Sequence, residues 1–200
     1  MAHLLMIESW VGASGKLLPP LLQSMGHSYT FVTRNPSHYQ NPHSSEPHPV
    51  LRYAKEVIET DTNDLDALCN AVRRSRYDGV ITVCDYYIET ARSVAKALGL
   101  TCPFSANVEK VRQKHLLRQA IDRARLPNVR YRLVKTWEEA KIAAADIPYP
   151  VVFKPVDLAS SAFVKLVRTE DELRLAFNEL ASFPLNFRKQ PRNPSCLLEE

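Results

Sequence analysis

The sequence predicts an α/β protein that begins with a doubly wound, Rossmann-like parallel sheet. Three observations support this class: strand and helix patterns alternate through the first hundred residues, the alternation stops near Thr101–Ser105, and 45% hydrophobic with 24% charged residues is a globular composition. Strands that alternate with helices pair in parallel through right-handed crossovers. We therefore expect two domains, residues 1–104 and residues 105–200.

Short apolar and β-branched runs predict the strands of the first domain, and the segments between them predict its helices. The helical pattern is clear where Leu65, Leu68 and Val72 fall at i, i+3 and i+7. We expect strands at 3–7, 29–33, 56–60 and 79–83, and helices at 16–25, 64–74 and 87–98.

Residues 35–49 interrupt this alternation with four prolines and three histidines, which predicts a surface loop. His38, His43 and His48 are five residues apart with prolines between them. This spacing suits neither a helical i, i+4 pair nor a short zinc clamp, so no metal site is expected here.

The second domain is expected to begin with one long helix, residues 107–124. Two later helices open with the capping-box patterns Thr136-x-x-Glu139 and Thr169-x-x-Glu172. The remaining expected elements are a strand at 130–135, a helix at 137–145, strands around Lys154 and Lys165, a helix at 170–182, a loop at 183–194 and a strand at 195–199.

Charge, hydropathy and cysteine spacing exclude several classes of protein. The net charge of +4 is slight, and the basic residues between 123 and 135 lack interleaved aromatics, so no nucleic-acid partner is expected. Without a signal-peptide pattern or an apolar run of about 18 residues, we expect a soluble, cytoplasmic protein with no membrane partner. Four scattered cysteines without a C-x-x-C pair predict reduced thiols.

One lysine interrupts an otherwise apolar strand, Tyr149–Pro155, which reads YPVVFKP. Buried strands rarely carry an ammonium group without a partner, so Lys154 needs an anion. The ordinary alternatives are a protein carboxylate or water at the strand end. A bound anionic ligand is the functional alternative.

Four segments, in this order and spacing, resemble the ATP-grasp family of ATP-dependent ligases: VRQKHLLRQAIDRARLPNVRY at 111–131, IPYPVVFKPVDLASSAFVKLV at 147–167, TEDELRLAF at 169–177 and CLLEE at 196–200. The resemblance covers nearly the whole chain. It implies a Rossmann-like pre-ATP-grasp domain followed by the first, incomplete α+β subdomains of an ATP-grasp module. We therefore expect the N-terminal part of a longer polypeptide, truncated at the hinge strand and inactive alone.

The resemblance implies that ATP converts a carboxylate to an acylphosphate, which an amine captures. Lys114 and Lys154 match the two family lysines that reach the α- and β-phosphates, where fixed cations offset the charge. By itself, Lys114 could instead lie on a solvated helix face with Arg112, His115 and Arg118. The implied partners are a small carboxylate such as an amino acid and an amine. A homodimer is an alternative that the sequence leaves open.

The turn at 157–162, DLASSA, stands where the family has its small-residue phosphate loop. Such loops use glycine, so here Ser160 and Ser161 would have to serve by hydroxyl and amide. Glu199 and Glu200 match the strand that contacts adenine. Adjacent strand residues point to opposite faces, so we expect only Glu199 to face the ligand. The resemblance also implies Mg²⁺, with ligands beyond residue 200.

The segment GASGK, residues 12–16, follows a strand and opens a helix, but it fits neither the GxxxxGK[ST] nor the GxGxxG pattern. Its helix N-terminus can still hold an anion, which makes Ser9, Gly12 and Gly15 further candidates. Two other functions stay open. The glycine-free loop fits a non-catalytic nucleotide-binding or sensing domain, whereas a dinucleotide-binding oxidoreductase lacks its glycine fingerprint.

Overall fold

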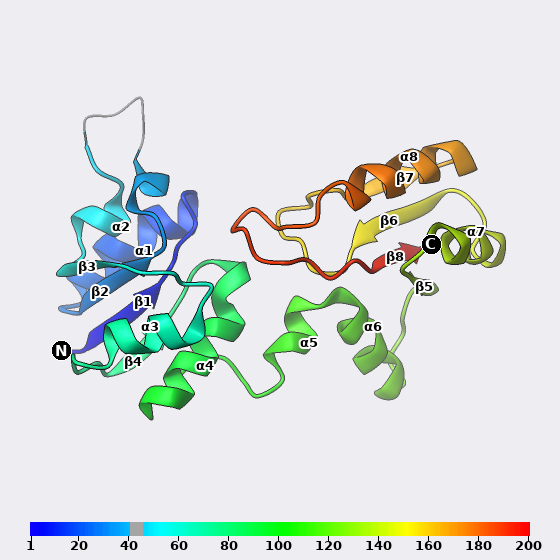
Figure 1. The fold of residues 1–200 in the computed structure, drawn as a ribbon. Helices are drawn as coiled ribbons and strands as arrows, with labels where there is room; N and C mark the ends of the chain where they lie inside the picture. The colour runs from blue at the N-terminus through cyan, green and yellow to red at the C-terminus, as the bar shows by residue number, and fades with distance from the viewer. Residues whose placement is uncertain (41–45) are drawn as a thin grey trace. The chain divides into compact units, whose positions relative to one another are not determined.

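The computed structural model describes residues 1–40 and 46–200, which form two compact units, Met1–Val108 and Glu109–Glu200 (Figure 1). Each unit contains a four-stranded sheet with helices packed on it. All strand pairs are parallel in the first sheet and antiparallel in the second. This confirms the α/β class and the Rossmann-like first sheet predicted from the sequence.

The first sheet has the strand order β3-β2-β1-β4. Strands β2 and β3 are added on one side of β1 and β4 on the other, so the strand order reverses between β1 and β4. In such sheets, this switch point is where ligands commonly bind, at the carboxyl ends of the strands. Its strands are β1 (His3–Ile7), β2 (Ser28–Thr33), β3 (Glu56–Glu59) and β4 (Gly79–Ile81).

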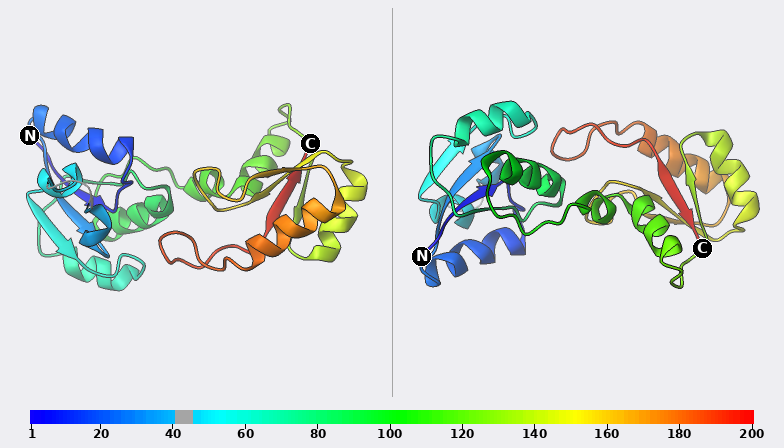
Figure 2. Two further views of the ribbon diagram at one scale, coloured as in Figure 1. Left: turned by 90° about the horizontal axis from the view of Figure 1, so that it is seen from above. Right: turned by 90° about the horizontal axis from the view of Figure 1, so that it is seen from below.

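Helices cover both faces of the first sheet: α1 lies on one side, and α3 and α4 lie on the other (Figure 2). Met6 and Phe31 are register partners and share a core with Leu22 of α1 and Val50 of α2. The helical elements are α1 (Ala13–Ser24), η1 (Pro36–Tyr39), α2 (Pro49–Arg52), α3 (Leu65–Val72), η2 (Asp85–Tyr87) and α4 (Ile88–Leu98).

The prediction of a surface loop at 35–49 is wrong in part. Tyr39 is fully buried, and its hydroxyl donates to the carboxylate of buried Glu8 at 2.5 Å. A buried carboxylate needs such donors, which pulls this segment onto the unit. The His48 ring is also buried, where it contacts Val11 O. His43 lies outside the described residues.

The second sheet has the strand order β5-β8-β6-β7, and β8 in its interior is buried along its whole length. Helices α7 and α8 lie on one face, and α6 lies on the other (Figure 2). The elements are α5 (Val108–Arg112), α6 (Lys114–Arg123), β5 (Tyr131–Val134), α7 (Trp137–Asp146), β6 (Val151–Pro155), β7 (Lys165–Val167), α8 (Glu170–Ala181) and β8 (Cys196–Glu199).

The long helix predicted at 107–124 is wrong, because Gln113 breaks it into α5 and α6. Gln113 has an extended backbone, with φ −92° and ψ 105°. The Lys114 amide, the first of α6, donates to Val156 O at 2.9 Å. A contact with the residue that follows β6 thus sets the start of α6 and fixes Lys114 beside the sheet.

Both predicted helix caps are present, but only one is a complete capping box. Thr136 accepts the Glu139 amide, and Glu139 accepts the Thr136 amide in return. Thr169 likewise accepts the Glu172 amide at 3.2 Å, whereas the Glu172 carboxylate accepts the Arg168 amide instead. Both arrangements satisfy amides at a helix start.

Residues 1–40 and 46–200 include no helix that is long and apolar enough to cross a bilayer. The four cysteines are free thiols, with Cys84 and Cys196 buried. Burial raises the pKa of the Cys196 thiol to about 12. This thiol is therefore protonated at neutral pH.

Candidate anion-binding site

Lys154 lies on the face of the second sheet that carries α6. The neighbouring Phe153 points toward α8, where its ring centroid lies 6.3 Å from that of Phe177. Side chains alternate along a strand, so Lys154 points to the other face. The register pairs Val152 with Glu199, which places Glu199 on the same face as Lys154.

Glu199 is held between two cations, Arg118 of α6 and Lys154 of β6. Lys154 Nζ lies 2.5 Å from Glu199 Oε2, and the Arg118 guanidinium donates to both Glu199 oxygens at 2.9 Å. The Arg118, Lys154 and Glu199 side chains are only 22%, 17% and 5% exposed. We call these three residues the Arg118–Glu199–Lys154 cluster. Lys154 has thus gained a carboxylate partner, one of the alternatives that the sequence left open.

The cluster carries a net positive charge at neutral pH. Burial by itself would raise the pKa of Glu199, but hydrogen bonds from Arg118 and Lys154 outweigh burial and lower that pKa below its ordinary value. The hydrogen bond to Glu199 also raises the pKa of Arg118. Two cations therefore share one carboxylate, so these three residues by themselves have one positive charge in excess. Asp122 is a further acidic group whose charge raises the pKa of Arg118.

Arg118 is fixed from its other side by Asn128. Arg118 Nη1 donates to Asn128 Oδ1 at 3.1 Å, and Asn128 Nδ2 donates to Asp122 Oδ1 at 2.7 Å. Tyr131 also donates to Asp122 at 2.7 Å. Hydrogen bonds from Asn128 and Tyr131 lower the pKa of Asp122. The guanidinium plane is thus oriented from both sides.

Lys114 and Arg112 hold the segment that follows β6. Lys114 Nζ donates to Leu158 O at 2.6 Å, and Arg112 Nη2 donates to Asp157 O at 2.8 Å. A solvated helix face for Arg112, Lys114 and Arg118, the ordinary alternative, is therefore wrong. Lys114 and Lys154 have different partners. Lys154 is a residue of β6, and Lys114 contacts Leu158, three residues after the end of that strand.

The segment after β6 adopts a glycine-like backbone without glycine. Ser160 and Ser161 both have φ of 56°, and Phe163 has φ of 59°. This left-handed conformation costs an L-residue about 1–2 kcal/mol. Ser160 and Ser161 are exposed, whereas Asp157 and Leu158 before them are buried. The backbone shape expected of a phosphate loop is thus present on serine residues.

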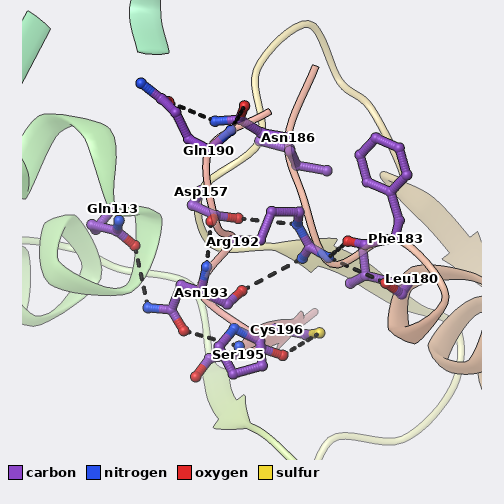
Figure 3. A network of polar contacts seen from close by, with 12 residues as sticks. Gln113, Asp157, Leu180, Phe183, Asn186, Gln190, Arg192, Asn193, Ser195 and Cys196 are labelled. Atoms are coloured by element: carbon purple, nitrogen blue, oxygen red, sulfur yellow. Dashed lines mark hydrogen bonds and ion pairs between the residues drawn. The ribbon is translucent and has the colours of Figure 1, made fainter. Parts of the chain in front are cut away.

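Arg192 anchors the start of this loop to the end of α8 (Figure 3). Its Nη1 donates to Leu180 O at 3.1 Å and to Phe183 O at 2.7 Å. Its Nε forms a buried ion pair with Asp157 Oδ1 at 3.5 Å, and Asp157 Oδ2 accepts the Asn193 amide at 2.6 Å. Asp157 therefore fixes one end of the loop while Ser160 and Ser161 lie at its exposed tip.

Glu200 is not part of the cluster, and the candidates of the first unit have their contacts within that unit. Glu200 is exposed and pairs with Arg130 at 2.7 Å. Ser9 is fully buried, and its amide donates to the Tyr39 hydroxyl. Gly12 is the N-cap of α1, and a Cβ added at Gly15 would meet Trp10 O at 1.7 Å. Close packing against Trp10 therefore accounts for Gly15.

Sequence reasoning missed the role of Arg118 and of Arg192. A signal for Arg118 was present, because it follows Lys114 by four residues and so lies on the same side of a helix. A buried carboxylate at Glu199 also requires a cationic partner. Arg192 lies in an irregular loop, and no sequence period relates it to Asp157.

The comparisons with known proteins agree with this fold. No family model matches the chain. The alanine–anticapsin ligase of Bacillus amyloliquefaciens is 28% identical over 106 residues, which are 53% of this chain and 22% of the ligase. The matched segment thus spans less than a quarter of that relative.

The solved structures that match the whole chain include the following two. The L-amino acid ligase from Bacillus licheniformis has a TM-score of 0.70 at 19% identity, with 100% of this chain and 44% of that chain covered. The N5-carboxyaminoimidazole synthetase from Staphylococcus aureus complexed with ADP has a TM-score of 0.71 at 16% identity, with 100% and 47% covered. The chain therefore has the fold of the N-terminal portion of ATP-grasp superfamily ligases, which confirms the resemblance, and it spans less than half of these structures.

Proposed function

We propose that this chain forms the first part of the nucleotide site of an ATP-dependent ligase that joins a carboxylate to an amine, on an amino acid or a similar small metabolite. In this proposal, residues 1–104 are the pre-ATP-grasp domain and residues 105–200 begin the ATP-grasp module. The net positive charge of the Arg118–Glu199–Lys154 cluster is the observation that carries the proposal. The names of the relatives, an alanine–anticapsin ligase and an L-amino acid ligase, support the substrate class.

Each candidate residue has a proposed role in binding the triphosphate. Lys154 supplies the surplus charge of the cluster, and Lys114 supplies a second cation next to the same strand end. Ser160 and Ser161 present backbone amides and hydroxyls from left-handed positions, as phosphate-binding loops do. Glu199 orients Lys154, and a contact of Glu199 or Glu200 with adenine stays a prediction.

ATP fits this site because ammonium groups and exposed loop amides are the donors that phosphate oxygens accept. Once bound, ATP would supply the phosphoryl group that activates the carboxylate. The Staphylococcus aureus relative is itself an ADP complex. No residue is assigned to Mg²⁺, because the part of the chain outside 41–45 has no group of three or more His, Cys, Asp or Glu arranged to hold a metal ion.

Calorimetric titration of the full-length protein with MgATP tests the role of Lys154. Lys154→Met should weaken binding about tenfold or more, because it removes a charge-assisted hydrogen bond to phosphate. Lys165→Met is the matched control, since Lys165 pairs with Glu179 of α8 on the other side of the sheet. Equal MgATP affinity of the two variants would contradict the proposal.

The glycine-free loop favours a second candidate, a nucleotide-binding or sensing domain that does not turn over. Ser160 and Ser161 keep the left-handed backbone but carry side chains where a glycine loop has none. The two candidates differ in one measurement on the full-length protein. Release of ADP that requires both a carboxylate and an amine supports the ligase, and MgATP binding without such release supports the sensor.

A further inference from the structure

Arg118 contacts Glu199 at both of its carboxylate oxygens. Its guanidinium donates to both carboxylate oxygens at 2.9 Å, whereas Lys154 contacts only Oε2. A planar guanidinium matches a carboxylate in this two-bond arrangement, which an ammonium group cannot form. Glu199 therefore keeps a cationic donor on each oxygen even when Lys154 turns away.

The contact between Arg118 and Glu199 determines how much positive charge Lys154 has available for an anion. If Glu199 had Lys154 as its sole partner, the pair would be neutral and would attract no phosphate. If the lysine left such a pair, the buried carboxylate would have no cationic partner, which costs free energy. Arg118 removes both obstacles, because it neutralises Glu199 and leaves the charge of Lys154 for an incoming anion.

We propose that Arg118 is a positioning residue that holds Glu199 so that Lys154 can bind a polyphosphate. The inference rests on the proposed function only in that the anion is a polyphosphate. Arg118 itself is held by Asn128 Oδ1 at 3.1 Å, and its backbone carbonyl accepts from Asn128 Nδ2 at 3.1 Å. The assignment concerns the second unit alone, since all these residues lie within Glu109–Glu200.

The test titrates the full-length protein with inorganic tripolyphosphate, which has no adenine and so reports the phosphate contacts alone. Arg118→Met makes the cluster neutral and should weaken tripolyphosphate binding about tenfold, the effect of one charge-assisted hydrogen bond. Arg118→Lys keeps the charge and should retain part of the affinity. Arg132→Met is the matched control, because it removes an exposed arginine that pairs with Asp146 and should bind as the wild type does.

A double variant separates a charge role from a merely structural one. Arg118→Met with Glu199→Gln removes both partners, so the charge of Lys154 is again uncompensated and binding should recover to within a few fold of the wild type. A structural role of Arg118 predicts no recovery. Glu199→Gln by itself should bind tripolyphosphate more tightly than the wild type, which keeps the test informative if Arg118→Met does not fold.

Three results would overturn the inference: equal binding by Arg118→Met and Arg132→Met, no recovery in the double variant, or weaker binding by Glu199→Gln. Failure of the ligase proposal gives a different pattern. A wild type that binds tripolyphosphate with the expected variant order, yet releases no ADP with any carboxylate and amine, contradicts the ligase and supports the role of Arg118. A wild type that binds no tripolyphosphate overturns both.

Discussion

Lys154 Nζ lies 2.5 Å from Glu199 Oε2, so the lysine proposed to bind phosphate is held by a carboxylate from the neighbouring strand. The two residues face the same side of the sheet because Val152, two residues before Lys154, is the register partner of Glu199. Arg118 shares the carboxylate from α6. The stability of the second unit and the proposed anion binding therefore depend on the same buried acidic group.

The stability supplied by Glu199 should depend on pH. Burial would raise the pKa of Glu199, but its hydrogen bonds with Arg118 and Lys154 outweigh burial and lower that pKa in the folded state, below the ordinary value of 4.5. The contribution is thus fully present above that ordinary value, which applies to the unfolded chain, and is lost as pH falls through the folded pKa.

Urea unfolding of the wild type and of Glu199→Gln checks this pH dependence. At pH 7 the wild type should be more stable by about 1–3 kcal/mol, as expected for hydrogen bonds to a charged group. The difference should shrink toward zero below about pH 4. If the difference in unfolding free energy stayed constant from pH 7 to pH 3, Glu199 would not be ionised in the folded protein.

Ser161→Gly should stabilise the second unit. Ser161 has φ of 56°, and release of left-handed strain of about 1–2 kcal/mol exceeds the entropy cost of glycine, about 0.5–1 kcal/mol. Ser182→Gly is the control, because Ser182 has φ of −74° and should lose stability. Urea midpoints measure both, and a loss in Ser161→Gly equal to that of Ser182→Gly would exclude strain at the loop.

Replacing one partner of the buried Arg192–Asp157 pair should lower the stability of the second unit. Arg192→Met leaves the Asp157 carboxylate buried without its cation and frees two carbonyls at the end of α8, so we expect a loss of about 3–5 kcal/mol. Arg132→Met, which breaks an exposed pair, should cost about 0–1 kcal/mol. Adding Asp157→Asn to Arg192→Met should cost less than the two single losses combined, and strict additivity would show that the pair is not coupled.

Replacement by alanine should destabilise the first unit strongly at Gly15 and little at Gly12. A Cβ at Gly15 would overlap Trp10 O at 1.7 Å, whereas a Cβ at Gly12 meets nothing within 4 Å. Gly15→Ala should therefore lose several kcal/mol through forced backbone movement, and Gly12→Ala should stay within about 1 kcal/mol. Thermal unfolding distinguishes them, and similar melting temperatures would refute the close packing at Trp10.

The sequence predicted the strands and most helices because apolar periods and caps are local signals, as at Leu65–Val72 or Thr136. It could not predict the break at Gln113, since the partner of the Lys114 amide is Val156, far along the chain. The same limit explains why Arg118 and Arg192 were missed: their roles depend on contacts made only in the folded unit. A cytoplasmic location and a homodimer stay predictions.

Protection of lysines from an amine-acylating reagent shows whether Lys154 and Lys114 contact a bound nucleotide. The full-length protein is acylated briefly with and without MgATP, and modification of each lysine is measured by peptide mass spectrometry with Lys165 as internal reference. MgATP should slow modification of Lys154 and Lys114 several fold relative to Lys165, whereas adenosine should not. Unchanged modification of Lys154 under saturating MgATP would mean that Lys154 does not bind the nucleotide phosphates.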